Sequence, residues 1–366
     1  MPGGEAEAGA QQATPGSQTP DQENAVPLVE GREDLFRLTK EVNFVQVPVT
    51  VKSDDGQLIA GLLREDFTVM EDGEKQRITY FTSDPFPLSA AVVFDLSMPD
   101  TDVNRVQQTL SALIGAFSEF DEVGIYTYGS TVRKLQEFTA ATGEILAISM
   151  ARLRKEQGRT GGVPVVGGPL GMPTPTVNGR PVDPSLPPSG SPTGANGRVI
   201  RRDSRVLNDA ILEAALDLEQ RDPTRRKVLF VISDGNEYGS KTTSGEVMKV
   251  LLSNQISLYA VAVGSAAIPG YGRLDRIDIP GIGGTPNILH RYSSATGGQV
   301  YTELSVSAIE DAYARITREA RNQYTLGYST PASPSSSYRT IEVLVHRPQL
   351  KIYAKDGYYP VPTRRR

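Results

Sequence analysis

The chain contains no cysteine, and only two histidines, His290 and His346, occur among its 366 residues. The lack of cysteine excludes disulfide bonds and thiolate metal sites, although it leaves the cellular compartment open. The two histidines belong to different predicted units, so a shared catalytic role is not expected. The sequence also lacks a G-x-S-x-G elbow and a Gly-rich phosphate loop after the first buried strand. We therefore predict that the protein is not an enzyme.

Long hydrophobic runs and a strong net charge are missing as well. Lys and Arg together number 38 and Asp and Glu 43, and the resulting charge of −5 argues against a general nucleic-acid binder. No apolar run approaches the roughly 20 residues that span a bilayer. The first residues lack the basic and apolar regions of a secretory signal peptide. The sequence thus predicts either a cytoplasmic protein or a chain from which a signal has been removed.

Three stretches are rich in Gly, Pro, Ser or Thr. Residues 1–37 bury too little apolar surface to offset their ordering entropy, so they are predicted to be a disordered leader. Residues 157–202 show no apolar periodicity, which favours a disordered insertion, with an adaptable binding surface as the alternative. The Gly-rich segment 267–286 follows a predicted strand, so we expect it on the ligand side of a sheet.

Segments near both ends of the chain have the β-branched content of antiparallel strands. Asp72-Gly73 accepts the positive φ angles of a type I′ hairpin turn, and Pro48 indicates an edge position or a bulge. The late strands have no crossover helices, so we assign them to the same unit as the early ones. The prediction is a β-sandwich-like domain built from residues 38–87 and 323–362. Its strands are expected at 41–51, 65–70, 76–81, 324–328, 338–345 and 350–354.

Between these segments, buried strands alternate with helical patterns over residues 88–322. Such alternation implies right-handed crossovers and a mostly parallel sheet that is covered on both faces. The predicted fold class is therefore α/β, with a doubly wound, Rossmann-like sheet inserted between the two halves of a small antiparallel β-sandwich. Strands are expected at 90–94, 123–128, 132–138, 227–233, 258–263 and 299–302, and helices at 103–117, 144–153, 206–218, 244–252 and 306–320.

Polar side chains directly follow two of the buried strands. The run LSAAVVFDLSMPD, residues 88–100, places Asp95 and Ser97 after its apolar part, and the run KVLFVIS is followed by Asp234. Ligands bind at the carboxyl edge of an open α/β sheet. Asp95, Ser97 and Asp234 are therefore candidate binding residues. The alternative is that these carboxylates only cap helices or brace loops.

Three motifs occur in the order found in a von Willebrand factor type A domain: FDLS at 94–97, LNDAI at 207–211 and VISDG at 231–235. The flanking segments VPVTVKSDDGQLIAGLLREDFTVMEDGEKQRI, QYTLGYST, YRTIEVLVHRP and LKIYAKDGYY resemble the von Willebrand factor A-related proteins common in acidobacteria. The resemblance covers roughly residues 38–360. It implies a type A fold, an exported protein of the periplasm, cell surface or medium, and an adhesion or assembly module that binds a protein partner.

The resemblance also implies a metal-ion-dependent adhesion site, from which this sequence departs. The family motif is Asp-x-Ser-x-Ser, then a Thr before the third helix and an Asp after the fourth strand. Pro99 stands at the second Ser position and Arg205 at the Thr position. Mg²⁺ prefers six oxygen ligands, and Arg205 adds a permanent cation. We therefore expect a degenerate, metal-free site in which Arg205 pairs with Asp95 or Asp234.

Alternatives stay open at this stage. A hydroxyl from Ser204, Thr160 or Thr193 could complete a rearranged site for Mg²⁺ or Ca²⁺ if the alignment shifts across the insertion. A structural envelope component that assembles through its edge strands is another possibility, and a hydrolase is a weaker one. Asp209 is expected to favour a helix N-terminus and not to bind a ligand.

The favoured hypothesis is a non-enzymatic protein-binding module with no cofactor, no nucleic-acid partner, no membrane span and no evident small-molecule substrate. Its predicted partner-binding residues are Asp95, Ser97, Arg205 and Asp234.

Overall fold

The computed structural model describes residues 42–158, 204–264, 288–331 and 337–360, together with two short strands, β8 (Thr176–Val177) and β9 (Arg180–Pro181). All of these residues belong to one compact unit, Glu41–Arg366. The predicted leader, most of the predicted insertion and the Gly-rich segment 267–286 lie outside the described residues. The proposed domain boundaries stay a prediction.

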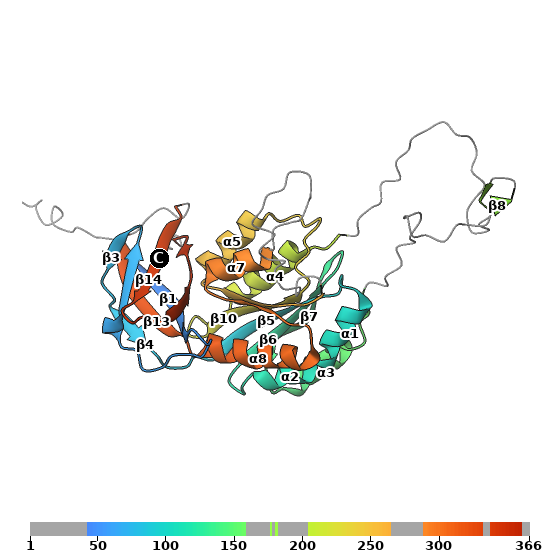
Figure 1. The fold of residues 1–366 in the computed structure, drawn as a ribbon, viewed down its shortest axis with the longest axis horizontal. Coiled ribbons are helices and arrows are strands. Elements are labelled where there is room, and N and C mark those ends of the chain that lie inside the picture. Colours follow the sequence, from blue (N-terminus) through green and yellow to red (C-terminus); the bar gives the residue numbers. More distant parts are fainter. Residues whose placement is uncertain are drawn as a thin grey trace, which may run out of the picture. The chain divides into compact units, whose positions relative to one another are not determined.

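A six-stranded sheet forms the centre of the fold (Figure 1), in the order β12-β11-β10-β5-β6-β7. Neighbouring strands are parallel except for the last pair, where β7 runs antiparallel to β6. Every residue of β5 is buried, which explains why this run shows no polar alternation. The strands are β5 (Leu88–Asp95), β6 (Glu122–Tyr128), β7 (Val132–Ala140), β10 (Arg226–Ser233), β11 (Ser257–Ala262) and β12 (Val300–Thr302).

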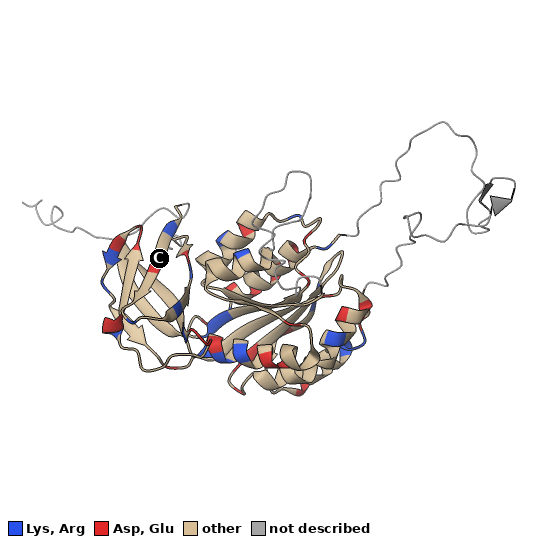
Figure 2. Cartoon of the chain, viewed as in Figure 1, with Lys and Arg blue, Asp and Glu red and all other residues tan. Residues whose placement is uncertain are grey.

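Helices cover both faces of this sheet because successive residues of β5 face opposite sides. Ala90, Val92 and Phe94 pack in a core with one set of helices, whereas Ala91 and Val93 pack with the other. The first set is α1 (Asp100–Gln108), α2 (Leu110–Ala116), α3 (Glu144–Leu153) and α8 (Val306–Arg321). The second set is α4 (Leu207–Glu219), α5 (Ser244–Ser253) and α7 (Ile288–Thr296). Figure 2 shows that Lys, Arg, Asp and Glu colour mainly the helices and loops and leave most of the central strands tan.

The helix predicted at 103–117 is divided into α1 and α2 at Thr109, whose hydroxyl donates to the carbonyl of Val106 at 2.7 Å. A threonine hydroxyl that bonds back to the preceding turn competes with helical hydrogen bonds, which accounts for the break. Within the described part of the chain, no helix is both long and apolar enough to cross a membrane.

Two four-stranded antiparallel sheets combine strands from both ends of the chain, as predicted. One has the order β15-β1-β13-β4 and the other β16-β14-β2-β3, and their apolar side chains share one core. The first sheet contains β1 (Val42–Ser53), β4 (Tyr80–Thr82), β13 (Tyr324–Pro331) and β15 (Leu350–Ala354). The second contains β2 (Phe67–Glu71), preceded by the short helix η2 (Arg64–Asp66), with β3 (Glu74–Gln76), β14 (Arg339–Val345) and β16 (Gly357–Tyr358).

The hairpin between β2 and β3 has positive φ at both Asp72 (49°) and Gly73 (81°), as a type I′ turn requires. The arm predicted at 76–81 is divided between the sheets, because β3 pairs with β2 while β4 pairs with β13. Pro48 lies where β1 is paired only with β13, since pairing with β15 begins at Val49. A missing N–H is tolerated at such a position.

The two faces of β1 have different surroundings. Val45, Val47 and Val49 are buried in the core between the two antiparallel sheets. On the opposite face, the Lys52 ammonium donates to Glu319 of α8, and Thr50 accepts a hydrogen bond from Gln323. The outer face of this sheet is therefore in contact with the α/β part of the molecule.

Candidate functional site at the carboxyl edge of the sheet

Asp95, the last residue of β5, is fully buried and accepts four hydrogen bonds. Its Oδ1 accepts from the backbone N–H of Ser97 at 2.8 Å and from the Ser97 hydroxyl at 2.5 Å. Its Oδ2 accepts from the Tyr128 hydroxyl at 2.8 Å and from the Ser233 hydroxyl at 2.7 Å. Tyr128 and Ser233 end β6 and β10, the two strands beside β5, so the sheet itself assembles this cluster.

Burial and charge act together on this carboxyl group. Removal from water, assisted by the nearby carboxylate of Asp234, raises the pKa of Asp95 from 3.8 to about 6. The hydrogen bonds from Ser97, Ser233 and Tyr128 oppose that rise. Burial, together with the charge of Asp95, raises the pKa of Tyr128 well above its ordinary value, so its phenol stays a proton donor.

Arg205 forms an ion pair with Asp234, whose Oδ2 accepts from the Arg205 Nη1 at 2.8 Å. Both side chains are largely shielded, with 19% of the arginine and 5% of the aspartate exposed. The Arg205 backbone is fixed by two hydrogen bonds with Tyr238, at 2.6 and 3.0 Å. The neighbouring Val206 N–H donates to Gly129 after β6. The predicted pairing of Arg205 with one of the two aspartates therefore occurs at Asp234.

The remaining positions of the predicted site lie at the start of α1. Pro99 is the N-cap residue and offers only its carbonyl, which accepts from the N–H of Asp102 at 2.9 Å. The Asp102 carboxylate pairs with Arg105 at 2.9 Å. It also lies over Gly264, where a side-chain carbon, if one were added, would come within 2.7 Å of Asp102 Oδ2. Gly264 has φ of +62°, so both its conformation and its surroundings favour glycine.

The oxygen atoms at this site do not form the octahedral shell of ligands that Mg²⁺ prefers. Asp95 already accepts four hydrogen bonds, and one oxygen of Asp234 is held by Arg205. Pro99 has no side-chain oxygen. In the described ranges, no group of three or more His, Asp or Glu side chains is arranged to hold a metal ion.

Other residues considered from the sequence have local roles. Asp209 accepts from the N–H groups of Lys241 and Thr242 at 3.0 and 2.8 Å, which ties α4 to the segment before α5. His346 bonds Thr68 at 2.8 Å in the β-sandwich part. Ser204 lies against Gly239, and the alternative ligands Thr160 and Thr193 fall outside the described residues.

The sequence-based prediction missed Tyr128 and Ser233, which donate the two inner hydrogen bonds to Asp95. Each is the last residue of a strand next to β5. Their positions at strand ends could have suggested them, but the pairing register was needed. Glu237 was also missed, and its carboxylate accepts from the Asn208 N–H at 2.8 Å at the start of α4.

The matches among solved structures include proteins whose titles name a type A domain. A von Willebrand factor type A protein from Catenulispora acidiphila matches 88% of this chain and 74% of its own, with 7% identity and a TM-score of 0.43. BatB from Bacteroides thetaiotaomicron matches 63% of this chain and 99% of its own, with 12% identity and a TM-score of 0.38.

A mussel byssus protein, proximal thread matrix protein 1, matches 69% of this chain and 50% of its own. Its identity is 11% and its TM-score 0.41, and that structure has a zinc-occupied metal-ion-dependent adhesion site. No family model and no curated protein matches this sequence.

Proposed function

We propose that this chain is a type A-like, non-enzymatic protein-binding module in which Arg205 takes the place of the divalent cation. The observation that carries the proposal is the 2.8 Å contact between the Arg205 guanidinium and Asp234 Oδ2. A guanidinium supplies a fixed positive charge and several donors to the carboxylates at this edge, which is the electrostatic role that a cation has elsewhere.

The predicted partner surface is the carboxyl edge formed by Asp95, Ser97, Arg205 and Asp234. Asp95 and Ser97 are buried, so Arg205 is the group of this set that a partner would meet first. A partner carboxylate would then pair with an arginine instead of completing a metal shell. Binding of this kind weakens with added salt and is insensitive to chelators.

The family resemblance also supports an extracytoplasmic location and an adhesion or assembly role. Cell fractionation with an antibody to the full chain tests the location, and signal confined to the cytoplasmic fraction contradicts it.

Crosslinking from the native envelope, followed by mass spectrometry, tests for a protein partner. Retention of that partner in EDTA with loss in high salt is expected, and loss in EDTA contradicts the proposal.

Metal binding provides the sharpest test of the site. Titration calorimetry with Mg²⁺, Ca²⁺ and Mn²⁺ should show no stoichiometric heat for the natural chain. The double variant Pro99→Ser, Arg205→Thr restores the two missing hydroxyls and removes the cation, so we expect it to bind a divalent ion. The single variant Pro99→Ser keeps Arg205, so we expect it to bind no divalent ion. Tight binding by the natural chain would mean that a rearranged metal site is the correct alternative.

A further inference from the structure

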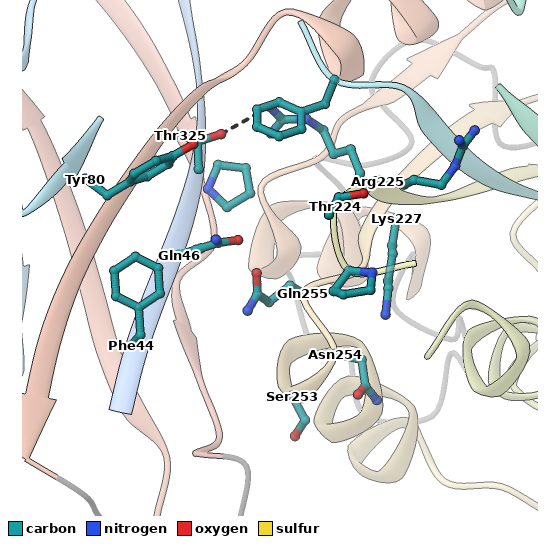
Figure 3. A pocket seen from close by; sticks show the side chains of 14 residues that line it. Phe44, Gln46, Tyr80, Thr224, Arg225, Lys227, Ser253, Asn254, Gln255 and Thr325 are labelled. Carbon is teal, nitrogen blue, oxygen red and sulfur yellow. Dashed lines mark hydrogen bonds between the residues drawn. The ribbon is translucent and has the colours of Figure 1, made fainter. Parts of the chain in front are cut away.

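A second concave site lies at the opposite end of the central sheet, where β10 begins. It is a cavity of about 550 Å³ between β1 and β4 on one side and the end of α5 on the other. Figure 3 shows the side chains that converge on it. The volume falls within the range of small-molecule sites. The lining residues are Phe44, Gln46, Pro48, Tyr80, Phe86, Pro223, Thr224, Arg225, Arg226, Lys227, Ser253, Asn254, Gln255 and Thr325.

The cavity has positive charge without a matching carboxylate, because none of its lining residues is Asp or Glu. Arg226 is 8% exposed, and within the part of the chain that the structure describes it bonds neutral groups, the Gln323 side chain at 2.9 Å and Thr325 at 3.2 Å among them. Among the described residues, none accepts a hydrogen bond from its buried Nε. Burial lowers the pKa of Arg226 to about 10. A buried cation left without a counter-charge is costly, so an anion in the cavity would be stabilised.

Lys227 adds a second cation to the same cavity. Its ammonium donates to the backbone carbonyl of Glu219 at 2.8 Å and forms no ion pair among the described residues. Burial lowers the pKa of Lys227 as well. Arg225 differs from these two, since its guanidinium turns toward Glu122 and the carbonyl of Leu88. The available charge in the cavity therefore comes from Arg226 and Lys227.

Aromatic rings form the opposing wall. The rings of Phe44 and Tyr80 meet edge to face with their centroids 6.4 Å apart. Phe44 is 50% exposed and Tyr80 is 40% exposed. They close over Gly327 of β13, where an added side-chain carbon would lie 2.6 Å from the Phe44 ring. The Phe86 ring lies 5.0 Å from the Arg226 guanidinium. Glycine at this position leaves room for the two exposed rings, which stand nearly perpendicular at 77° and together form an apolar corner.

Two amide side chains point into the space between the cations and the rings. Figure 3 shows Gln46 and Gln255 facing each other there, one from β1 and one from the end of α5. Gln255 has φ of 56°, a left-handed conformation that glycine usually adopts after a helix. A side chain kept in a strained backbone position is typical of a functional site.

We propose that this cavity binds a small organic anion with a flat aromatic body. The anionic group lies against Arg226 and Lys227, the ring packs on Phe44 and Tyr80, and the amides of Gln46 and Gln255 bond its polar edges. This site is separate from the carboxyl edge of the sheet, so its test is independent of the proposed protein-binding function.

The proposal is tested by measuring the binding of 2-naphthoate to the full chain, with calorimetry and with saturation-transfer NMR. We expect 2-naphthoate to bind about tenfold more tightly than the neutral 2-naphthamide, because the carboxylate offsets the buried positive charge. Adding 2-naphthyl phosphate tells whether the site prefers a carboxylate or a phosphate. Absence of binding for both anions up to about 5 mM, or equal affinity for acid and amide, overturns the proposal.

Variants locate the binding. Lys227→Gln and Phe44→Ala are each expected to weaken 2-naphthoate binding about fivefold or more, and both side chains are partly exposed, so the fold should tolerate them. Lys75→Gln makes the same charge change at an exposed position of β3 and should leave the affinity unchanged. Unchanged affinity in both cavity variants would place the binding elsewhere and refute the proposal.

Discussion

Lys355 lies between β15 and β16 and is a residue whose charge is strongly disfavoured by its surroundings. Only 5% of it is exposed, and its ammonium lies 5.5 Å from the centre of the Tyr358 ring. Across the described ranges, no carboxylate forms an ion pair with it. Burial lowers the pKa of Lys355 from 10.5 to about 7. The folded protein thus binds fewer protons at this site than the unfolded chain does between these two values.

Stability should therefore depend on pH through this lysine. Because the unfolded chain binds the extra proton, the free energy of unfolding rises as pH increases from about 7 toward 10. The penalty is fully present below pH 7, and its size is about 5 kcal/mol for this difference in pKa. Lys355→Met should be more stable than the natural chain near pH 7, and this advantage should shrink by pH 9.5.

Urea unfolding at pH 6.5, 8 and 9.5 measures this effect. Lys351→Met is a suitable control, since 52% of the Lys351 side chain is exposed and its removal should not change the pH profile. If the difference between Lys355→Met and the natural chain stays constant with pH, the lysine is not the titrating group.

At the scale of elements, Gln255 follows the C-cap residue of α5, Asn254, at a position where glycine is the usual residue. The Ile256 N–H donates to the Leu251 carbonyl at 3.0 Å, which closes the helix end, and Gln255 takes the left-handed conformation with φ of 56°. A left-handed L-residue costs about 1 kcal/mol relative to glycine.

Gln255→Gly should therefore raise the free energy of unfolding by about 1 kcal/mol, and it should weaken binding in the cavity beside it. Chemical denaturation measures the first effect. Gln220→Gly is a control at another helix end, because Gln220 is the C-cap residue of α4 with φ of −79°, so it gains nothing from glycine. Equal stability changes at the two positions would contradict the explanation.

At the scale of the whole molecule, a buried ionic network joins the antiparallel sheets to the α/β part. The Lys52 ammonium contacts Glu319 at 2.5 Å, and 7% and 5% of these side chains is exposed. The Tyr301 hydroxyl donates to the same glutamate at 2.6 Å, while Gln299 donates to its other oxygen at 3.0 Å. Each charge in this network depends on its partner, because neither reaches water freely.

Removing one partner of this pair should lower the free energy of unfolding more than removing both. Lys52→Met leaves a buried carboxylate, so a loss of about 3–5 kcal/mol is expected, whereas Lys52→Met with Glu319→Leu should recover most of it. A double-mutant cycle in urea measures the coupling. Additive effects of the two substitutions would show that the pair does not connect the two parts energetically.

Several elements could be predicted from the sequence because their patterns are local. The apolar run of β5 predicts a strand buried on both faces, and the positions of Asp95 and Asp234 directly after apolar runs predict the carboxyl edge. Asp72-Gly73 determined a type I′ turn by its own conformational preference. The joining of early and late strands followed from the absence of crossover helices.

The partners of those residues were decided only by tertiary structure. Two sets of contacts depend on which strands lie beside β5 and in what register. They are the ion pair of Arg205 with Asp234 and the hydrogen bonds that Tyr128 and Ser233 donate to Asp95. The cavity of Arg226 likewise forms between strands and helices that are far apart in the chain. Hydrophobic periodicity is a property of one element, whereas charge balance and cavity shape arise between elements. The sequence by itself therefore determined the strands, the helices and the carboxyl edge, and only the tertiary packing decided which polar groups contact one another.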